Sequence, residues 1–205
     1  MKERPVIFNA EMVRAILDGR KTQTRRVIAN VGPDNCIPLQ KPTKTKGGIY
    51  THVMDAPGHG LCPFGQVGDR LWVRETFMDL TGTGIEATTG KFEGFAYRTD
   101  TPAGSYGDEV RKEYGLKWTP SLHMPRKACR ILLEITAVRV ERLNDISHDD
   151  AKAEGCCYGR GGGVPDFAVT PADHFPTLWA SIYGEESWSA NPWVWVIEFR
   201  RVGGA

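Results

Sequence analysis

The sequence has no long apolar run. Its 205 residues contain no stretch of about 18 consecutive apolar residues, so no transmembrane helix is expected. The opening residues, MKERPVIFNAEM, also lack the apolar core of a secretory signal. We therefore expect a cytoplasmic protein with no membrane partner.

The chain has almost no net charge. Its formal charge is +1, which argues against a protein that coats nucleic acid through bulk positive charge. Hydrophobic residues make up 40% of the chain and charged residues 25%, which is ordinary for a globular protein. Any contact with a nucleic acid or a nucleotide would have to come from a local basic patch.

Closely spaced cysteine pairs are also missing. The five cysteines, at positions 36, 62, 129, 156 and 157, form no CxxC motif, so we expect reduced thiols and no disulfide framework. His52, His59 and Cys62, with Cys36 as a distant fourth ligand, form the one candidate metal set. Their spacing fits no standard zinc module and the segment is rich in Gly and Pro, so a plain loop is favoured.

Hydrophobic periodicity predicts short strands and helices in mixed order. A strand at 4–9 precedes a helix capped by Asn9 and ended by Gly19. Further strands are predicted at 68–77, 126–143 and 193–201, and helices at 147–155 and 173–184, with Ser147 and Asp173 as N-caps. Residues 29–68 and 79–122 are rich in turn-forming residues and are interpreted as insertions into one domain spanning 1–205.

The long strand at 126–143 changes its apolar face near Thr136, which suggests a bulge or a sharp bend. Bent strands of this kind are typical of small closed barrels. The strand at 193–201 carries an aromatic stripe that is expected in the core, except for Trp193 at its start. We therefore predict an α+β fold built on a mostly antiparallel β-barrel with a few short helices.

A basic segment follows the first helix, with no acid between Arg20 and Arg26. It reads as a solvated surface turn or as a functional loop. A helix C-terminus favours one or two cations, whereas this segment has four, with Thr22 and Thr24 between them. Such a set offers donors for phosphate or carbonyl oxygens, a possible amine base in Lys21 and a possible hydroxyl nucleophile.

Glu75 is the second residue of interest. In the stretch GDRLWVRETF it shares a strand face with Leu71 and Val73, so a half-buried carboxylate in need of a partner is expected. That partner is either an arginine in a structural salt bridge or a group of a functional site. A second basic cluster, in SLHMPRKACR, includes His123, Arg126 and Arg130.

These segments carry a family resemblance. DGRKTQTRR, from Asp18 to Arg26, resembles the GxKxxxxR-type loop of ASCH domains, with Gly19, Lys21 and Arg26 at the Gly, Lys and Arg places. GDRLWVRETF, SLHMPR with RILLEIT, and NPWVWVIEF resemble further segments of phage- and prophage-associated members. The four segments in order span most of the chain, and the two insertion-like regions are covered least.

The resemblance implies a PUA-like barrel and binding of a nucleoside, nucleotide or RNA. Small bacterial members are amidohydrolases that deacetylate N4-acetylcytidine with a Lys, Thr and Glu set, which carries over to Lys21, Thr24 and Glu75. No cofactor and no metal are implied. This chain is about twice as long as those amidohydrolases, so its insertions cap the cleft, enlarge the substrate or replace the activity.

Two functions follow. In the first, Thr24 attacks the amide carbonyl of an acylated nucleobase, Lys21 takes its proton and Glu75 orients Lys21. In the second, the protein is a non-catalytic module that binds RNA or a modified base through phosphate contacts and a stacking aromatic. The residues expected to bind the substrate or nucleic acid are Arg20, Arg25, Arg26, Trp72, Arg74, His123 and Arg126.

Overall fold

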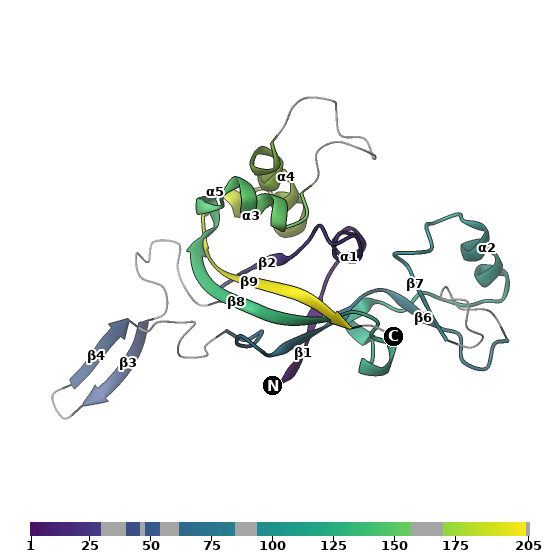
Figure 1. Ribbon diagram of the computed structural model, residues 1–205, viewed down its shortest axis with the longest axis horizontal. Coiled ribbons are helices and arrows are strands. Elements are labelled where there is room, and N and C mark those ends of the chain that lie inside the picture. Colours follow the sequence, from purple (N-terminus) through teal and green to yellow (C-terminus); the bar gives the residue numbers. More distant parts are fainter. Residues whose placement is uncertain (30–39, 46–47, 54–61, 85–93, 157–169, 204–205) are drawn as a thin grey trace. The chain divides into compact units, whose positions relative to one another are not determined.

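The computed structural model describes residues 1–29, 40–45, 48–53, 62–84, 94–156 and 170–203. The fold is α+β, as predicted (Figure 1). The strands are β1 (Glu3–Ile7), β2 (Gln23–Val27), β3 (Gln40–Thr45), β4 (Gly48–Val53), β5 (Arg70–Arg74), β6 (Phe77–Asp79), β7 (Phe95–Tyr97), β8 (Leu132–Arg142) and β9 (Trp193–Gly203). The helices are α1 (Ala10–Leu17), α2 (Tyr106–Glu113), α3 (His148–Ala153), α4 (Pro171–Tyr183) and α5 (Glu186–Ser189), with 3₁₀ turns at Ser121–His123, Arg126–Ala128 and Leu143–Asp145.

Five strands form the main sheet in the order β1-β5-β8-β9-β2. β1 runs parallel to β5, and β2 runs antiparallel to β9. β8 and β9 are neighbours, as the barrel prediction requires, and Figure 1 shows both as long curved ribbons.

The closed barrel, however, is not found among the described residues. β1 and β2 are the edge strands of this sheet, and no pairing between them closes it. β3 and β4 of the first insertion-like region pair with each other, and β7 of the second pairs with β6, instead of supplying strands that would close the sheet.

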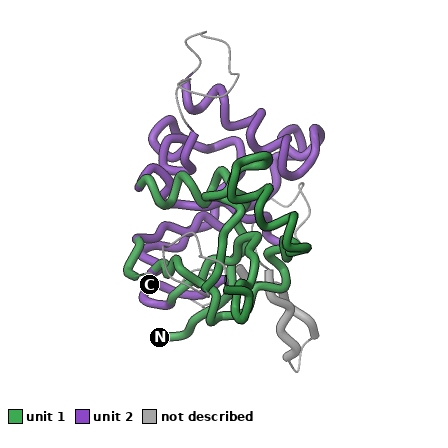
Figure 2. Tube along the Cα trace, turned by 90° about the vertical axis from the view of Figure 1, so that its right-hand side faces the viewer, with its two compact units in different colours: residues 1–18, 70–133, 201–205 green, residues 19–69, 134–200 purple. Residues whose placement is uncertain are grey.

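The chain forms two compact units (Figure 2). Unit 1 contains residues 1–18, 70–133 and 201–205, and unit 2 contains residues 19–69 and 134–200. Each unit is therefore assembled from segments that are separated in the sequence. The prediction of a single domain over 1–205 stays a prediction.

Unit 1 begins with β1 and α1. The side chain of Asn9 accepts a hydrogen bond from the amide of Met12 at 2.8 Å, which confirms the predicted N-cap. Val13 and Ile16 of α1 are buried. Two further apolar groups lie in unit 1, one around Phe77, Tyr97, Met124 and Ala128 and one around Met78, Leu80 and Ala96.

Unit 2 has its own core beneath α3 and α4. The core consists of Leu143, Ala151, Cys156, Phe175, Trp179, Val194 and Val196. Ser147 caps α3, as predicted, by accepting a hydrogen bond from the amide of Asp150. In α4 the N-cap is Thr170, not Asp173 as predicted, and Asp173 is the third helical residue. The two form a capping box, in which the Thr170 side chain accepts from the Asp173 amide and the Asp173 carboxylate accepts from the Thr170 amide.

The aromatic stripe of β9 is buried beyond Trp193, as predicted. Trp195 and Phe199 are buried. Trp193 is half-buried, and the guanidinium of Arg142 lies 4.3 Å from its ring centroid. Among the described helices, none combines the length and the apolar content needed to cross a bilayer.

Candidate active site

The predicted basic loop is a strand. Residues 23–27 form β2, and Lys21 makes an isolated antiparallel bridge with Glu154 just before it. Lys21, Gln23, Thr24 and Arg25 are each 2% exposed. The solvated-turn reading is therefore wrong for this part of the segment, because acidic side chains near α3 pair with the buried cations.

The side chain of Lys21 is held by Glu154. Its Nζ donates to the Glu154 carboxylate at 2.7 Å and to the Glu154 carbonyl at 2.9 Å. Burial lowers the pKa of Lys21 below its ordinary value of 10.5, and the charge and hydrogen bond of Glu154 oppose that effect. Lys21 is thus a buried amine that loses its proton more readily than an exposed lysine does.

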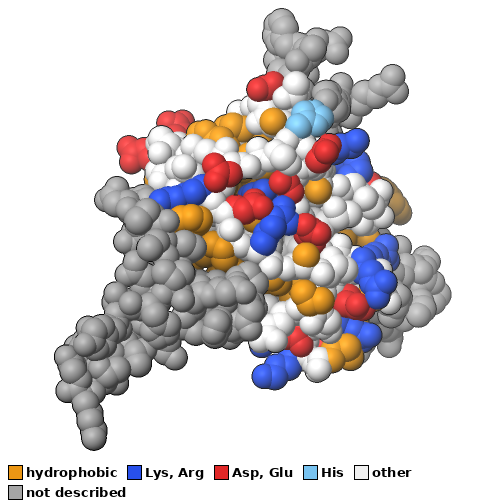
Figure 3. Space-filling view, turned by 60° about the vertical axis from the view of Figure 1, so that its left-hand side comes forward, with side chains coloured by type: hydrophobic (Ala, Val, Ile, Leu, Met, Phe, Trp, Pro, Cys, Tyr) orange, Lys and Arg blue, Asp and Glu red, His pale blue; other side chains and the backbone are white. Residues whose placement is uncertain are grey.

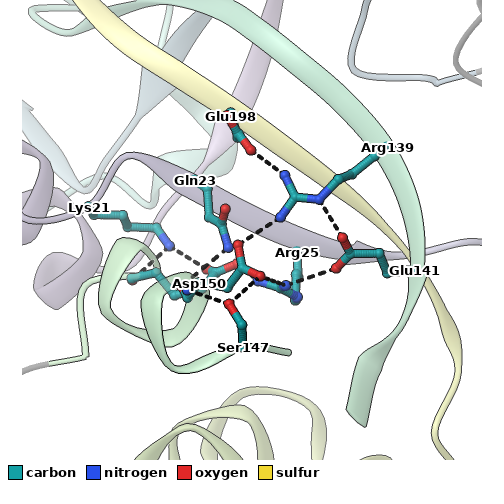
Figure 4. Close-up of polar contacts among 9 residues, drawn as sticks. Lys21, Gln23, Arg25, Arg139, Glu141, Ser147, Asp150 and Glu198 are labelled. Carbon is teal, nitrogen blue, oxygen red and sulfur yellow. Dashed lines mark hydrogen bonds and ion pairs between the residues drawn. The ribbon is translucent and has the colours of Figure 1, made fainter. Parts of the chain in front are cut away.

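Arg25 links this pair to a wider network, shown in Figure 4. Its guanidinium contacts Glu154 at 3.3 Å, Glu141 at 3.1 Å and Asp150 at 3.4 Å. Because Lys21, Gln23 and Arg25 alternate along the strand, they share the face that meets α3. Gln23 completes this face by donating to the Asp150 carbonyl at 3.2 Å.

Arg139 of β8 joins the acidic side chains of the network. It pairs with Glu141, with Glu198 and, at 2.7 Å, with Asp150. Burial opposes the charge of Asp150, but hydrogen bonds from Ser147 and Gln23 and the charges of Arg25 and Arg139 lower its pKa. Three cations and four carboxylates meet in this network, so one negative charge is in excess when all are ionised.

Thr24 occupies an alternate position of β2, opposite Ile197 of β9. Successive side chains of a strand point to opposite faces, so Thr24 faces away from Lys21, Gln23 and Arg25. The arrangement therefore separates the proposed hydroxyl nucleophile from the proposed amine base.

Glu75 has a different set of partners, all in unit 1. Its carboxylate receives Arg130 Nε at 2.8 Å, Arg130 Nη2 at 2.9 Å and Thr99 Oγ1 at 3.0 Å. The partner is thus an arginine, as one of the two readings of Glu75 predicted. Arg130 also pairs with Asp100 and lies 4.0 Å from the ring centroid of Tyr97.

Lys21 and Thr24 belong to unit 2 and Glu75 belongs to unit 1. Each of the two charged side chains has an ion-pair partner within its own unit. Lys21 and Thr24 point to opposite faces, and the prediction that Glu75 joins either of them in one cleft stays a prediction.

The predicted binding cations of unit 2 differ in exposure. Arg20 is exposed and donates to the Gly155 carbonyl at 3.3 Å, next to the Lys21–Glu154 pair. Arg26 is half-buried, with its guanidinium 6.0 Å from the ring centroid of Phe64, whereas Arg25 is buried in the network. Arg20 is thus the one of these three that reaches solvent most fully.

In unit 1, Trp72 is 9% exposed and the guanidinium of Arg74 lies 4.9 Å from its ring centroid. His123 is exposed, and Arg126 pairs with Glu3 at 2.9 Å. On the face shown in Figure 3, Lys and Arg side chains are interspersed with Asp and Glu. Trp72 therefore has little surface for stacking a base, and the described side chains on the face in Figure 3 mix both signs of charge.

The candidate metal set lies largely outside the described residues. Cys36, His59 and the side chain of His52 fall there, and Cys62 is a buried, reduced thiol. Within the described ranges, no group of three or more His, Cys, Asp and Glu side chains is arranged to hold a metal ion.

Sequence reasoning missed the acidic half of the network. Glu154 is separated from Lys21 by 133 positions, and the sequence predicts it only as part of the helix at 147–155. The available signal was alternation: Lys21, Gln23 and Arg25 have the spacing of one strand face, and Asp150 and Glu154 have the spacing of one helix face.

A comparison with protein-family models finds no match, and a comparison with curated proteins finds none either. Among solved structures, the chain is similar to protein EF3133 from Enterococcus faecalis, which is described by the family DUF984. The match covers 100% of this chain and 83% of that chain, with a TM-score of 0.44 and 10% sequence identity. A likeness this low carries no argument about the function of the chain.

Proposed function

We propose that this chain is an amidohydrolase of the ASCH type, which removes the acyl group from an acylated nucleobase or nucleoside such as N4-acetylcytidine. The observation that carries the proposal is the state of Lys21. Its side chain is fully buried, its pKa is lowered by burial, and a carboxylate holds it at 2.7 Å. Buried lysines with lowered pKa values are the ones that serve as general bases.

In this mechanism the neutral amine of Lys21 accepts a proton from a water molecule. The water oxygen forms a bond to the acyl carbon, and the bond between that carbon and the exocyclic nitrogen then breaks. Lys21 returns the proton to the leaving nitrogen, which gives acetate and cytidine from N4-acetylcytidine. Water is the attacking group because Thr24 lies on the opposite face of β2.

Arg20 is assigned to substrate binding. It is exposed, it precedes Lys21 in the chain, and its contact with the Gly155 carbonyl places it beside the Lys21–Glu154 pair. Its guanidinium can donate to the carbonyl oxygen of the substrate as negative charge develops there.

The non-catalytic alternative requires exposed cations and an exposed aromatic side chain. Arg25 and Trp72 are buried, and Arg126 is paired with Glu3, so fewer of the predicted phosphate and stacking contacts can reach an RNA ligand. The hydrolase is therefore the better supported of the two functions.

The test is chromatographic detection of cytidine released from N4-acetylcytidine. Lys21→Arg keeps the cation but cannot act as a base, so turnover should fall by about 100-fold or more. Lys152→Met, which removes an exposed lysine of α3, is the matched control and should retain wild-type turnover. Binding of N4-acetylcytidine without hydrolysis by the wild type would reject the hydrolase and favour the binding module.

A further inference from the structure

The residues just before β2 form hydrogen bonds with the C-terminal end of α3. The backbones of Lys21 and Glu154 form an antiparallel bridge, and the Thr22 amide donates to the Ala153 carbonyl at 2.8 Å. The Lys21 side chain then contacts both the carbonyl and the carboxylate of Glu154. The amine is thus held by groups on a neighbouring helix end.

Glu154 is itself fixed by a second cation. One carboxylate oxygen, Oε2, receives Lys21, and the other, Oε1, receives Arg25 at 3.3 Å. Its side chain is 5% exposed, and those of Lys21 and Arg25 are fully buried. Because Arg25 is also paired with Glu141 and Asp150, the carboxylate of Glu154 has little freedom to turn.

We propose that Glu154 is the positioning residue of Lys21, the carboxylate that fixes where the amine points during proton transfer. This inference rests on the proposed function. It gives Glu154 the role that the ASCH resemblance assigned to Glu75, whose carboxylate is engaged by Arg130 and Thr99.

The charges around Lys21 determine the sign of the expected effect. Glu154 at the end of α3 raises its pKa, as does Cys156, whereas Arg26 of β2 lowers it and burial lowers it most. Neutralising Glu154 therefore removes the largest opposing influence and should lower the pKa of Lys21 further. Arg25 remains in that variant, and its positive charge also favours a lower pKa of Lys21.

The first experiment measures this without any substrate. Lysines labelled at the ε-carbon are titrated by NMR, and the Lys21 signal is assigned as the one lost in Lys21→Arg. Glu154→Gln should lower the pKa of Lys21 by about one unit or more. Glu198→Gln, which neutralises a carboxylate of the same network that is paired with Arg139, is the matched control and should leave it unchanged.

An unchanged Lys21 titration in Glu154→Gln would overturn the inference. If that variant does not fold, Glu154→Asp keeps the charge but withdraws the carboxylate by one methylene. Loss of contact should then lower the pKa of Lys21 by a smaller amount, and no change in this variant would equally overturn it.

The second experiment follows turnover of N4-acetylcytidine against pH. The rate should rise as Lys21 becomes neutral, so Glu154→Gln should move the acidic limb to lower pH, by the same shift as the NMR titration. We expect a fall in kcat of about 10-fold or more with little change in KM, because orientation is lost but substrate contacts remain. A fall in kcat with an unchanged KM separates positioning from a purely electrostatic influence, which would move the acidic limb but leave the maximal kcat near that of the wild type.

The two experiments separate the two claims. Absence of hydrolysis in the wild type would reject the proposed function and with it the positioning role, whatever the titration shows. If Glu154→Gln shifts the Lys21 titration but not the acidic limb of the rate profile, Lys21 is not the base. Glu154 would then still control the protonation of Lys21. Hydrolysis with both shifts equal is the result that supports the inference.

Discussion

Each unit buries a carboxylate against a cation, but the two cations behave in opposite ways. In unit 1, Arg130 meets Glu75 through two nitrogens and also pairs with Asp100. Burial opposes its charge, but these hydrogen bonds raise the pKa of Arg130 above its ordinary value. In unit 2, burial outweighs the single carboxylate that holds Lys21, and its pKa falls.

The difference follows from the shapes of the two side chains. A guanidinium is planar and meets a carboxylate with two parallel hydrogen bonds, so it remains charged. An ammonium is a compact charge that loses its proton readily when it is desolvated. A buried arginine pair is therefore suited to holding a fold together, and a buried lysine pair is suited to moving a proton.

Removing the arginine of unit 1 should have the largest effect on stability. Arg130→Met leaves the buried carboxylate of Glu75 without its cation, so we expect a loss of about 3 kcal/mol in the free energy of unfolding. Urea denaturation measures it. The double variant Glu75→Gln, Arg130→Met should recover part of this loss, because a neutral amide leaves no unpaired charge.

A matched control lies four residues away. Arg126 pairs with Glu3 at 2.9 Å, but its side chain is 47% exposed. Arg126→Met should therefore cost less than about 1 kcal/mol. Equal losses in the two variants would mean that burial of the Glu75 pair is not what distinguishes it.

The network of unit 2 should make stability depend on acid. Because the pKa of Asp150 is lowered in the folded protein, its contribution is present above its ordinary value of 3.8 and is lost as the pH falls through the lowered value. Asp150→Asn should remove about 1 kcal/mol at neutral pH and flatten the fall in stability below pH ~4.

Denaturation midpoints between about pH 2 and pH 7 give this comparison. Asp149, whose side chain is 100% exposed, provides the control variant Asp149→Asn, which should follow the wild type at every pH. A flattened curve in the control but not in Asp150→Asn would contradict the assignment.

The smallest effect is expected at Thr24. Thr24→Val keeps the shape of the side chain and removes its hydroxyl, and since Thr24 faces away from Lys21, turnover of N4-acetylcytidine should stay within about 2-fold of wild type. A loss as large as that of Lys21→Arg would instead restore Thr24 as the nucleophile.

Local features of the sequence predicted part of the fold. Asn9 and Ser147 were found as helix caps because a cap depends on residues only three positions away. The long strands β8 and β9 were found from their apolar alternation. Closure into a barrel could not be predicted in this way, since it depends on which strands occupy the edges of the sheet.

The sequence predicted the candidate site residues but not the residues that pair with them. The four cations of 20–26 and the carboxylate of Glu75 stood out, but their partners did not. Glu154 is 133 positions from Lys21, and Arg130 is 55 positions from Glu75. Charge pairing over such distances is decided by the packing of helices and strands, which no local pattern of residues reveals.

The interleaving of the two units also has a consequence for synthesis. β2 pairs with β9, so residues 23–27 leave the ribosome about 170 residues before their sheet partner exists, or roughly ten seconds or more at ordinary elongation rates. For most of that interval the acidic side chains of 141–154, which pair with Lys21 and Arg25, have not been made either. Pairing of β2 with β9 is therefore a late step in the folding of unit 2.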